Sequence, residues 1–156
     1  MRLTRALLGV FASAVVIVSA GCSGGPTTDL DAAGVTKELA NAGLPATLSV
    51  TFDESSDPNK LLGRPGGYTS KTAFTDDRVK APGAKKGDLT LGGSVEVFAS
   101  EDEAEKRAEY VKTIAASSPM FAEYTYLRGT VVLRVSKELT PTDAAAYEAA
   151  LSKIVE

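Results

Sequence analysis

The chain has 156 residues, of which 44% are hydrophobic and 24% charged, with one cysteine, no histidine and no tryptophan. This length suits one globular domain and a short additional segment. Without histidine, the sequence excludes a Ser-His-Asp triad, a Cys-His nucleophile and an imidazole metal site, and a single cysteine excludes a disulfide framework or a thiolate zinc site. Carboxylate, amine, hydroxyl and backbone groups remain as the available chemistry.

The first 21 residues have the pattern of an export signal. Arg2 and Arg5 precede an apolar run of 13 residues, 6–18, and no acidic residue occurs before Cys22. Such a run suits the core of a signal peptide and is shorter than the roughly 20 residues that span a bilayer. We therefore expect residues 1–21 to be removed, which leaves 15 basic against 20 acidic residues and changes the formal charge from −3 to −5.

The only cysteine stands where the signal should be cut. Residues 19–23, Ser-Ala-Gly-Cys-Ser, resemble a bacterial lipobox, which implies that Cys22 receives a diacylglyceryl thioether and becomes the acylated first residue. The match departs at Ser19, where a lipobox usually has leucine. An ordinary cleavage site at Val18-Ser19-Ala20 is the alternative, and it would release a soluble protein with a free thiol. Because two or more acyl chains hold a protein stably on a membrane, lipidation predicts an anchored protein on the outer face of the cytoplasmic membrane.

The processed chain is expected to consist of a tether and one domain. Residues 22–28 contain the cysteine and then small, polar residues, which predicts an acylated flexible tether. In residues 29–156, apolar residues at helical spacing predict a helix over 29–42, and alternation predicts a strand over 47–52 with Leu48, Val50 and Phe52 on one face. Asp57-Pro58 predicts the start of a short helix that ends at Gly63.

The second half of the domain alternates strands and helices more clearly. Strands are predicted over 68–74 and 94–98, and a β-hairpin over 123–136 turns at Arg128-Gly129. Ser100 and Thr140 are predicted caps of the second and third long helices, of which the last extends to residue 154.

These elements predict an α+β fold, an antiparallel sheet of about five strands with helices packed on one face. The other face is expected to be polar and to be either wetted or the place of a partner. Its predicted residues are Thr47, Ser49, Thr51, Lys71, Glu96, Tyr124, Thr130 and Arg134.

Residues 57–74, DPNKLLGRPGGYTSKTAF, together with GGSVEVFAS and the C-terminal LRVSKELTPTDAAAYEAAL, resemble small uncharacterised lipoproteins of actinobacteria and of their phages or prophages. The resemblance implies a surface lipoprotein and supplies no catalytic residues. A weaker likeness in layout, through Leu61, Leu62, Gly63 and Pro65, is to small secreted modules that include envelope-assembly lipoproteins and β-lactamase inhibitory proteins.

One partner contact is predicted within the most specific of these segments. Arg64, Tyr68 and Lys71 could point into one concavity, and an arginine beside an aromatic residue is typical of interface hot spots. Gly63 to Gly67 lacks the Gly-Lys-Ser/Thr of a phosphate loop, so we interpret it as a turn.

The function expected from the sequence is binding rather than catalysis. We expect a monomeric, lipid-anchored, non-catalytic interaction module without cofactor or metal, whose partner is an envelope protein or wall polymer. The net acidic charge argues against nucleic acid. A superinfection-exclusion lipoprotein of phage or prophage origin, and a small inhibitor of a secreted or envelope enzyme, are the alternatives.

Overall fold

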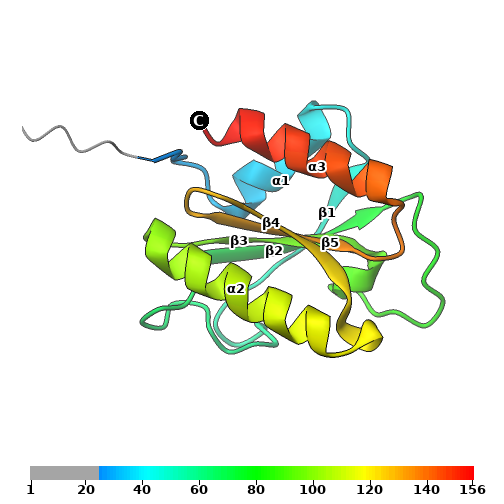
Figure 1. The fold of residues 1–156 in the computed structure, drawn as a ribbon, viewed down its shortest axis with the longest axis horizontal. Coiled ribbons are helices and arrows are strands. Elements are labelled where there is room, and N and C mark those ends of the chain that lie inside the picture. The colour runs from blue at the N-terminus through cyan, green and yellow to red at the C-terminus, as the bar shows by residue number, and fades with distance from the viewer. Residues whose placement is uncertain (1–24) are drawn as a thin grey trace, which may run out of the picture.

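The structure, a computed structural model, describes residues 25–156, which form one antiparallel sheet with helices on both faces (Figure 1). The predicted α+β class with five antiparallel strands is confirmed. The strand order is β1-β2-β3-β5-β4. The elements in chain order are α1 (Ala32–Asn41), β1 (Ala46–Thr51), β2 (Ser70–Asp76), η1 (Leu89–Leu91), β3 (Gly92–Val97), α2 (Glu101–Ser117), η2 (Pro119–Phe121), β4 (Glu123–Arg128), β5 (Val131–Ser136) and α3 (Pro141–Ile154).

The helices begin at side chains that accept hydrogen bonds from their first turns. Ser100 accepts from the N–H of Glu103 at 3.4 Å and Thr140 from that of Asp143 at 3.1 Å, which confirms both predicted caps. The first helix starts later than predicted, because Asp31 is its cap and accepts from Gly34 N–H at 2.7 Å. Each cap satisfies an amide that has no partner within the helix.

α1 and α3 cover one face of the sheet and enclose the main core. Phe74 of β2 stacks on Tyr147 of α3 with ring centroids 5.4 Å apart. The prediction that Val131, Leu133 and Val135 share a face of the hairpin is confirmed, since all three lie in this core. Other core residues are aliphatic and come from α1, β1, β3 and α3: Ala32, Val35, Leu39, Ala46, Val95, Val97, Ala144 and Leu151.

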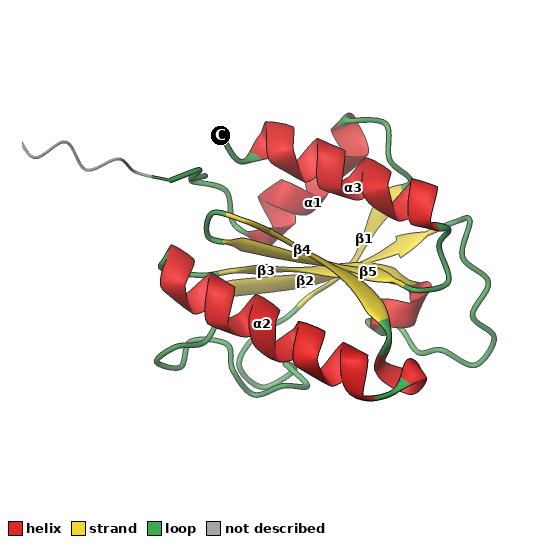
Figure 2. Cartoon of the chain, in the orientation of Figure 1, coloured by secondary structure: helices red, strands yellow, loops and turns green. Residues whose placement is uncertain are grey.

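α2 crosses the opposite face, which corrects the expectation that all helices pack on one side (Figure 2). Its small residues Ala104 and Ala108 pack with Tyr68, Phe98 and Val132 in a second core cluster. Small side chains at this spacing let the helix approach the sheet closely. The face expected to be wetted is therefore covered around Lys71 and Glu96, which are buried.

The structure also corrects the predicted faces of two strands, β4 and β1. Tyr124 lies on the α3 side and donates a hydrogen bond to the carbonyl of Leu139 at 3.3 Å. In β1, the register shifts between Leu48, which pairs with Phe74, and Val50, which pairs with Ala73. Because a bulge of this kind reverses the alternation of faces, the prediction that Leu48 and Val50 share a face is wrong.

The predicted short helix at 57–62 is absent, and turns occupy this stretch. The Asp57 carboxylate accepts hydrogen bonds from the N–H groups of Asn59, Leu61 and Leu62, at 3.2, 2.8 and 3.2 Å. Lys60 has a φ of 56°, in the left-handed region, which ends any helix at its first turn. Asp57 thus acts as a cap without a helix to follow it.

The segment before α1 is also ordered differently from the prediction. The N–H of Thr27 donates to the carbonyl of Glu156 at 2.8 Å, and the N–H of Leu30 donates to Thr28 Oγ1 at 3.2 Å. Residues 25–28 therefore pack against the domain instead of forming part of a flexible tether. The predicted signal peptide and the predicted lipidation site, Cys22, lie outside the described residues. Within 25–156, no helix is long and apolar enough to cross a bilayer.

Candidate functional site

A cluster of charged side chains is buried between the sheet, α2 and the segment that joins β1 to β2. Its centre is Lys71 of β2, whose Nζ lies 3.1 Å from Asp57 Oδ1 and 3.2 Å from the hydroxyl of Tyr68. In the amide orientation that satisfies both ends of the side chain, Asn59 Oδ1 accepts a third hydrogen bond from Lys71 Nζ at 2.8 Å. All three donors of the ammonium group are therefore used.

Asp57 is the point at which the β1–β2 connection is fixed to the sheet. The Tyr68 hydroxyl lies 2.7 Å from both carboxylate oxygens of Asp57. The rings of Phe52 and Tyr68 flank Lys71 Nζ, with centroids at 5.0 and 5.1 Å. The ammonium group is thus enclosed by the carboxylate of Asp57, the hydroxyl edge of Tyr68 and the ring of Phe52.

Glu96 of β3 joins this cluster to α2 and β5. Its carboxylate accepts two hydrogen bonds from Arg107, at 2.8 and 3.0 Å, and one from Arg134 Nη1 at 3.4 Å, and Lys71 Nζ lies 3.8 Å away. Arg134 also forms a two-pronged pair with Glu123 of β4. The positive charges of Lys71, Arg107 and Arg134 are therefore matched by three carboxylates. Buried charges need such pairing to offset the cost of removing them from water.

The environment shifts the pKa values of these groups in directions that follow from the contacts. Burial would raise the pKa of Asp57, but hydrogen bonds from Tyr68 and Leu61 and the charge of Lys71 hold it well below its usual value. Burial likewise opposes ionisation of Glu96, and the neighbouring arginines outweigh it and lower the pKa. Burial lowers the pKa of Lys71 and raises that of Tyr68.

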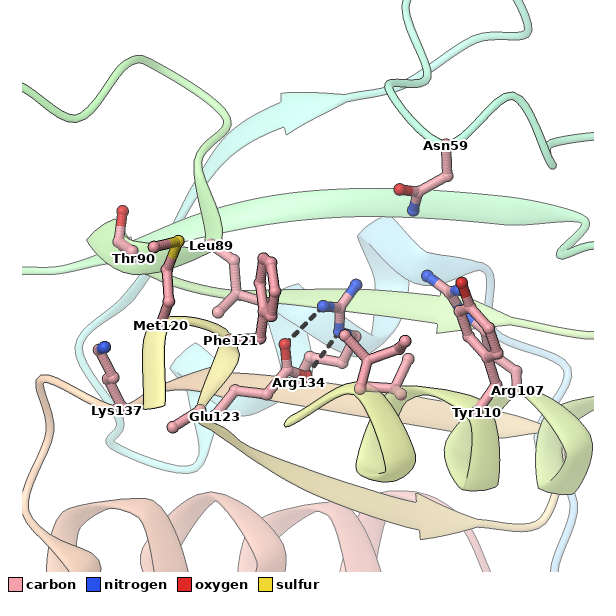
Figure 3. Close-up of a pocket in the computed structure, with 13 residues that line it drawn as sticks. Asn59, Leu89, Thr90, Arg107, Tyr110, Met120, Phe121, Glu123, Arg134 and Lys137 are labelled. Atoms are coloured by element: carbon pink, nitrogen blue, oxygen red, sulfur yellow. Dashed lines mark hydrogen bonds and ion pairs between the residues drawn. The ribbon is translucent and has the colours of Figure 1, made fainter. Parts of the chain in front are cut away.

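A groove of about 300 Å³ opens above the outer edge of this cluster. Figure 3 shows Arg134 and Glu123 at its floor, Phe121 and Met120 on one side, and Tyr110 with Arg107 on the other. η2 supplies the first side and α2 the second. The two-pronged pairs of Arg107 and Arg134 fix their guanidinium groups in place, so the floor is rigid and polar.

The rim of this groove gathers exposed apolar side chains. Six large hydrophobic residues of the described chain are exposed, and four of them line the groove: Tyr110, Ile114, Met120 and Phe121, with 59, 37, 77 and 52% of their surface accessible. Leu48 and Leu127 are the other two. The exposed large apolar side chains of the described residues are therefore concentrated on one side of the domain.

Two cationic side chains of the groove have hydrogen-bond donors that contact no other described residue or only one. Arg107 uses Nε and Nη2 on Glu96, and within residues 25–156 its Nη1 has no hydrogen-bond partner. Lys137, at the η2 end of the groove, is exposed, and among the described residues it donates only to the carbonyl of Pro119, at 2.8 Å. The free donors of the groove are therefore cationic.

The predicted contact patch of Arg64, Tyr68 and Lys71 is not a surface in the structure. Tyr68 and Lys71 do meet, as predicted, but their exposed fractions are 0 and 4%, so they belong to the buried cluster. Arg64 is exposed in the neighbouring turn. The sequence does not reveal the burial of Lys71, because charged residues at alternating positions of a strand usually indicate a solvent-exposed face. The helix that brings Arg107 over this face is positioned by tertiary packing, which has no local signal in the sequence.

Two signals in the sequence point to the observed site. Lys71, Glu96 and Arg134 alternate in sign at the face expected to be polar, and Arg107 stands within the Ala104–Ala108–Val111 stripe of α2. A charged residue inside a stripe of small residues indicates a buried ion pair when opposite charges face it. The described residues contain no group of three or more Cys, Asp or Glu placed to bind a metal ion.

Comparison of the chain with protein-family models, with curated proteins and with solved structures finds no match.

Proposed function

We propose that this protein is an exported, lipid-anchored binding module on the outer face of the cytoplasmic membrane, attached through Cys22, which binds its partner in the groove between α2 and η2. The observation that carries the binding role is the concentration of four of the six exposed large apolar side chains around this one groove. Tyrosine, methionine, phenylalanine and arginine together are the residues enriched at protein interfaces.

The occupant that fits the groove is a protein segment with an apolar side chain next to a carboxylate. The apolar side chain would lie against Met120 and Phe121, and the carboxylate would accept from Lys137 beside them. Charge supports this choice, because the groove is lined by three cations and one carboxylate in a chain whose residues 22–156 carry a formal charge of −5.

The buried carboxylates of the ionic cluster are not poised as general acids. A general acid at neutral pH needs a carboxyl group whose pKa is raised, as burial without a cation does. Asp57 and Glu96 have the opposite shift, because each is held by cations. Their role in this proposal is to hold the groove floor in one conformation.

Two measurements test the two halves of the proposal separately. Intact mass spectrometry of the processed protein should show a diacylglyceryl group on Cys22, and an unmodified thiol would refute the anchor. For the groove, the double variant Met120→Ser, Phe121→Ser should lose partner binding by at least about tenfold, since each buried anchor contributes more than 1 kcal/mol.

The matched control is Leu48→Ser, which removes an exposed apolar side chain of β1 away from the groove. It should leave partner binding unchanged. Equal loss in the control and in the double variant would show that binding depends on general surface hydrophobicity and not on the groove.

A further inference from the structure

The segment that leads to the anchor is docked at one end of the domain. The Thr27 N–H donates to the carbonyl of Glu156 at 2.8 Å. The carbonyl of Pro26 lies so close to Gly129, in the β4–β5 turn, that a Cβ there would collide with it, and Gly25 lies against the carboxylate of Glu101. The chain therefore contacts the C-terminus, the β4–β5 turn and the start of α2 together.

The position of Cys22 follows from its distance along the chain. It precedes Gly25 by three residues, and three extended residues span at most about 11 Å. The sulfur that would carry the lipid is consequently confined to this end of the domain, whatever the conformation of the residues between.

The groove lies toward the other end. α2 begins beside the docked segment at Glu101 and lines the groove from Arg107 to Ile114, 6 to 13 residues later, a rise of about 9 to 20 Å. β4 runs back from Glu123 at the groove to Arg128, about 17 Å away. Figure 1 agrees, with the start of α2 and the β4–β5 turn on the side where the chain enters and the short helix after α2 on the far side.

We infer that the anchored domain stands end-on, with the groove at the end away from the bilayer, so that its partner is a protein reached from the wall or the medium and not the lipid surface. This inference rests on the proposed lipidation of Cys22. Exposed Glu101, Asp102, Glu105 and Glu156 lie at the anchored end, and their charge opposes contact with anionic headgroups. The lipid alone would then hold this end near the membrane.

Two labels on one helix test this orientation. Cysteine is introduced in the full-length protein by Asp102→Cys or by Ala116→Cys, both at exposed positions of α2 about 21 Å apart along the helix. Since a thioether at Cys22 does not react with maleimide, the introduced thiol alone takes a fluorophore. The labelled, membrane-extracted proteins are placed in vesicles that contain headgroup nitroxide lipids.

Quenching should be stronger at position 102 than at position 116 by at least about threefold, because the separation of about 21 Å exceeds the reach of contact quenching. Equal quenching in vesicle-bound protein, or stronger quenching at 116, would overturn the end-on orientation and leave the anchor intact. Failure of both proteins to associate with vesicles would overturn the anchor and the orientation together.

A matched pair of glycine variants tests the docked segment itself. Gly129→Ala places a methyl group against Pro26, whereas Gly66→Ala adds one in open space, and both positions have positive φ, 52° and 74°. The Gly129→Ala variant should reduce the difference in quenching between the two labels, and Gly66→Ala should preserve it. An unchanged difference in Gly129→Ala would show that docking of Pro26 does not set the orientation.

Discussion

The two faces of the sheet are built by different physics. On the α1 and α3 face, most of the buried side chains are aliphatic or aromatic, with Phe74 stacked on Tyr147, and Asp76 is buried there as an ion paired with Arg78. On the α2 face, Lys71, Glu96 and Asp57 are buried as ions. An apolar face gains free energy from burial, whereas a buried ionic cluster gains little after desolvation. The comparison indicates that the first face supplies stability and the second fixes the geometry of the groove.

The largest expected effect is on the apolar face. Phe74→Ala should lower the free energy of unfolding by about 3–5 kcal/mol, because it removes a fully buried ring and leaves a cavity beside Tyr147. Urea denaturation followed by circular dichroism measures this. A loss below about 1 kcal/mol would contradict the assignment of the main core to this face.

On the ionic face, removing one charged side chain should lower the free energy of unfolding by a similar amount. Glu96→Ala leaves Arg107, Arg134 and Lys71 without the carboxylate that they share, and should destabilise by about 3–5 kcal/mol. The double variant Glu96→Ala, Arg107→Ala should be less destabilised than the sum of the single variants, by at least about 0.5 kcal/mol. Strict additivity would show that the two groups do not interact as the structure has them.

The pH dependence of stability should follow the carboxylates. Asp57, Glu96 and, on the apolar face, Asp76 all have pKa values lowered by folding from their ordinary values of 3.8, 4.5 and 3.8. Groups of this kind stabilise the fold above their unfolded pKa values, and the contribution is lost as pH falls through the folded ones.

We therefore expect the free energy of unfolding to be constant between pH 5 and 7 and to be lower by at least about 1 kcal/mol at pH 3. Lys71→Met should weaken this fall, because Asp57 loses the cation that holds its pKa down. Denaturation curves at several pH values measure both, and an unchanged acid dependence in the variant would contradict the pairing of Lys71 with Asp57.

The smallest effect on stability is expected at the groove rim. Met120→Ser should change the free energy of unfolding by no more than about 0.5 kcal/mol, since this side chain is 77% exposed. Thermal unfolding of the variant checks this. A marked destabilisation would mean that Met120 supports the fold and is not held available for a partner.

The sequence predicts the parts of this fold that depend on local chemistry. Ser100 and Thr140 cap helices wherever those helices pack, and Arg128-Gly129 turns the hairpin because glycine accepts the required positive φ of 52°. Asp57 shows where prediction from local chemistry fails. The Asp57-Pro58 pair predicts a capped helix, but the Asp57 carboxylate is also hydrogen-bonded to Tyr68 and Lys71. These tertiary contacts decide the conformation of the segment.

The candidate site could not be predicted in full for a related reason. The alternation of Lys71, Glu96 and Arg134 correctly indicates a shared face, but only the position of α2, which brings Arg107 to Glu96, shows that this face is buried. The groove depends on the placement of α2 and η2, which follow one another along the chain, over β4 and β5, and this tertiary arrangement has no local signature in the sequence.

Site-specific photo-crosslinking in intact cells tests the central claim most directly. A photoreactive amino acid replaces Phe121 in the groove in one variant and Leu48 on β1 in the other, and the crosslinked partner segment is sequenced by mass spectrometry. The account predicts an adduct from position 121 but not from position 48, on a protein segment in which an apolar side chain adjoins Asp or Glu. Equal adducts from both positions, or a groove adduct with lipid or with a second copy of this chain, would contradict it.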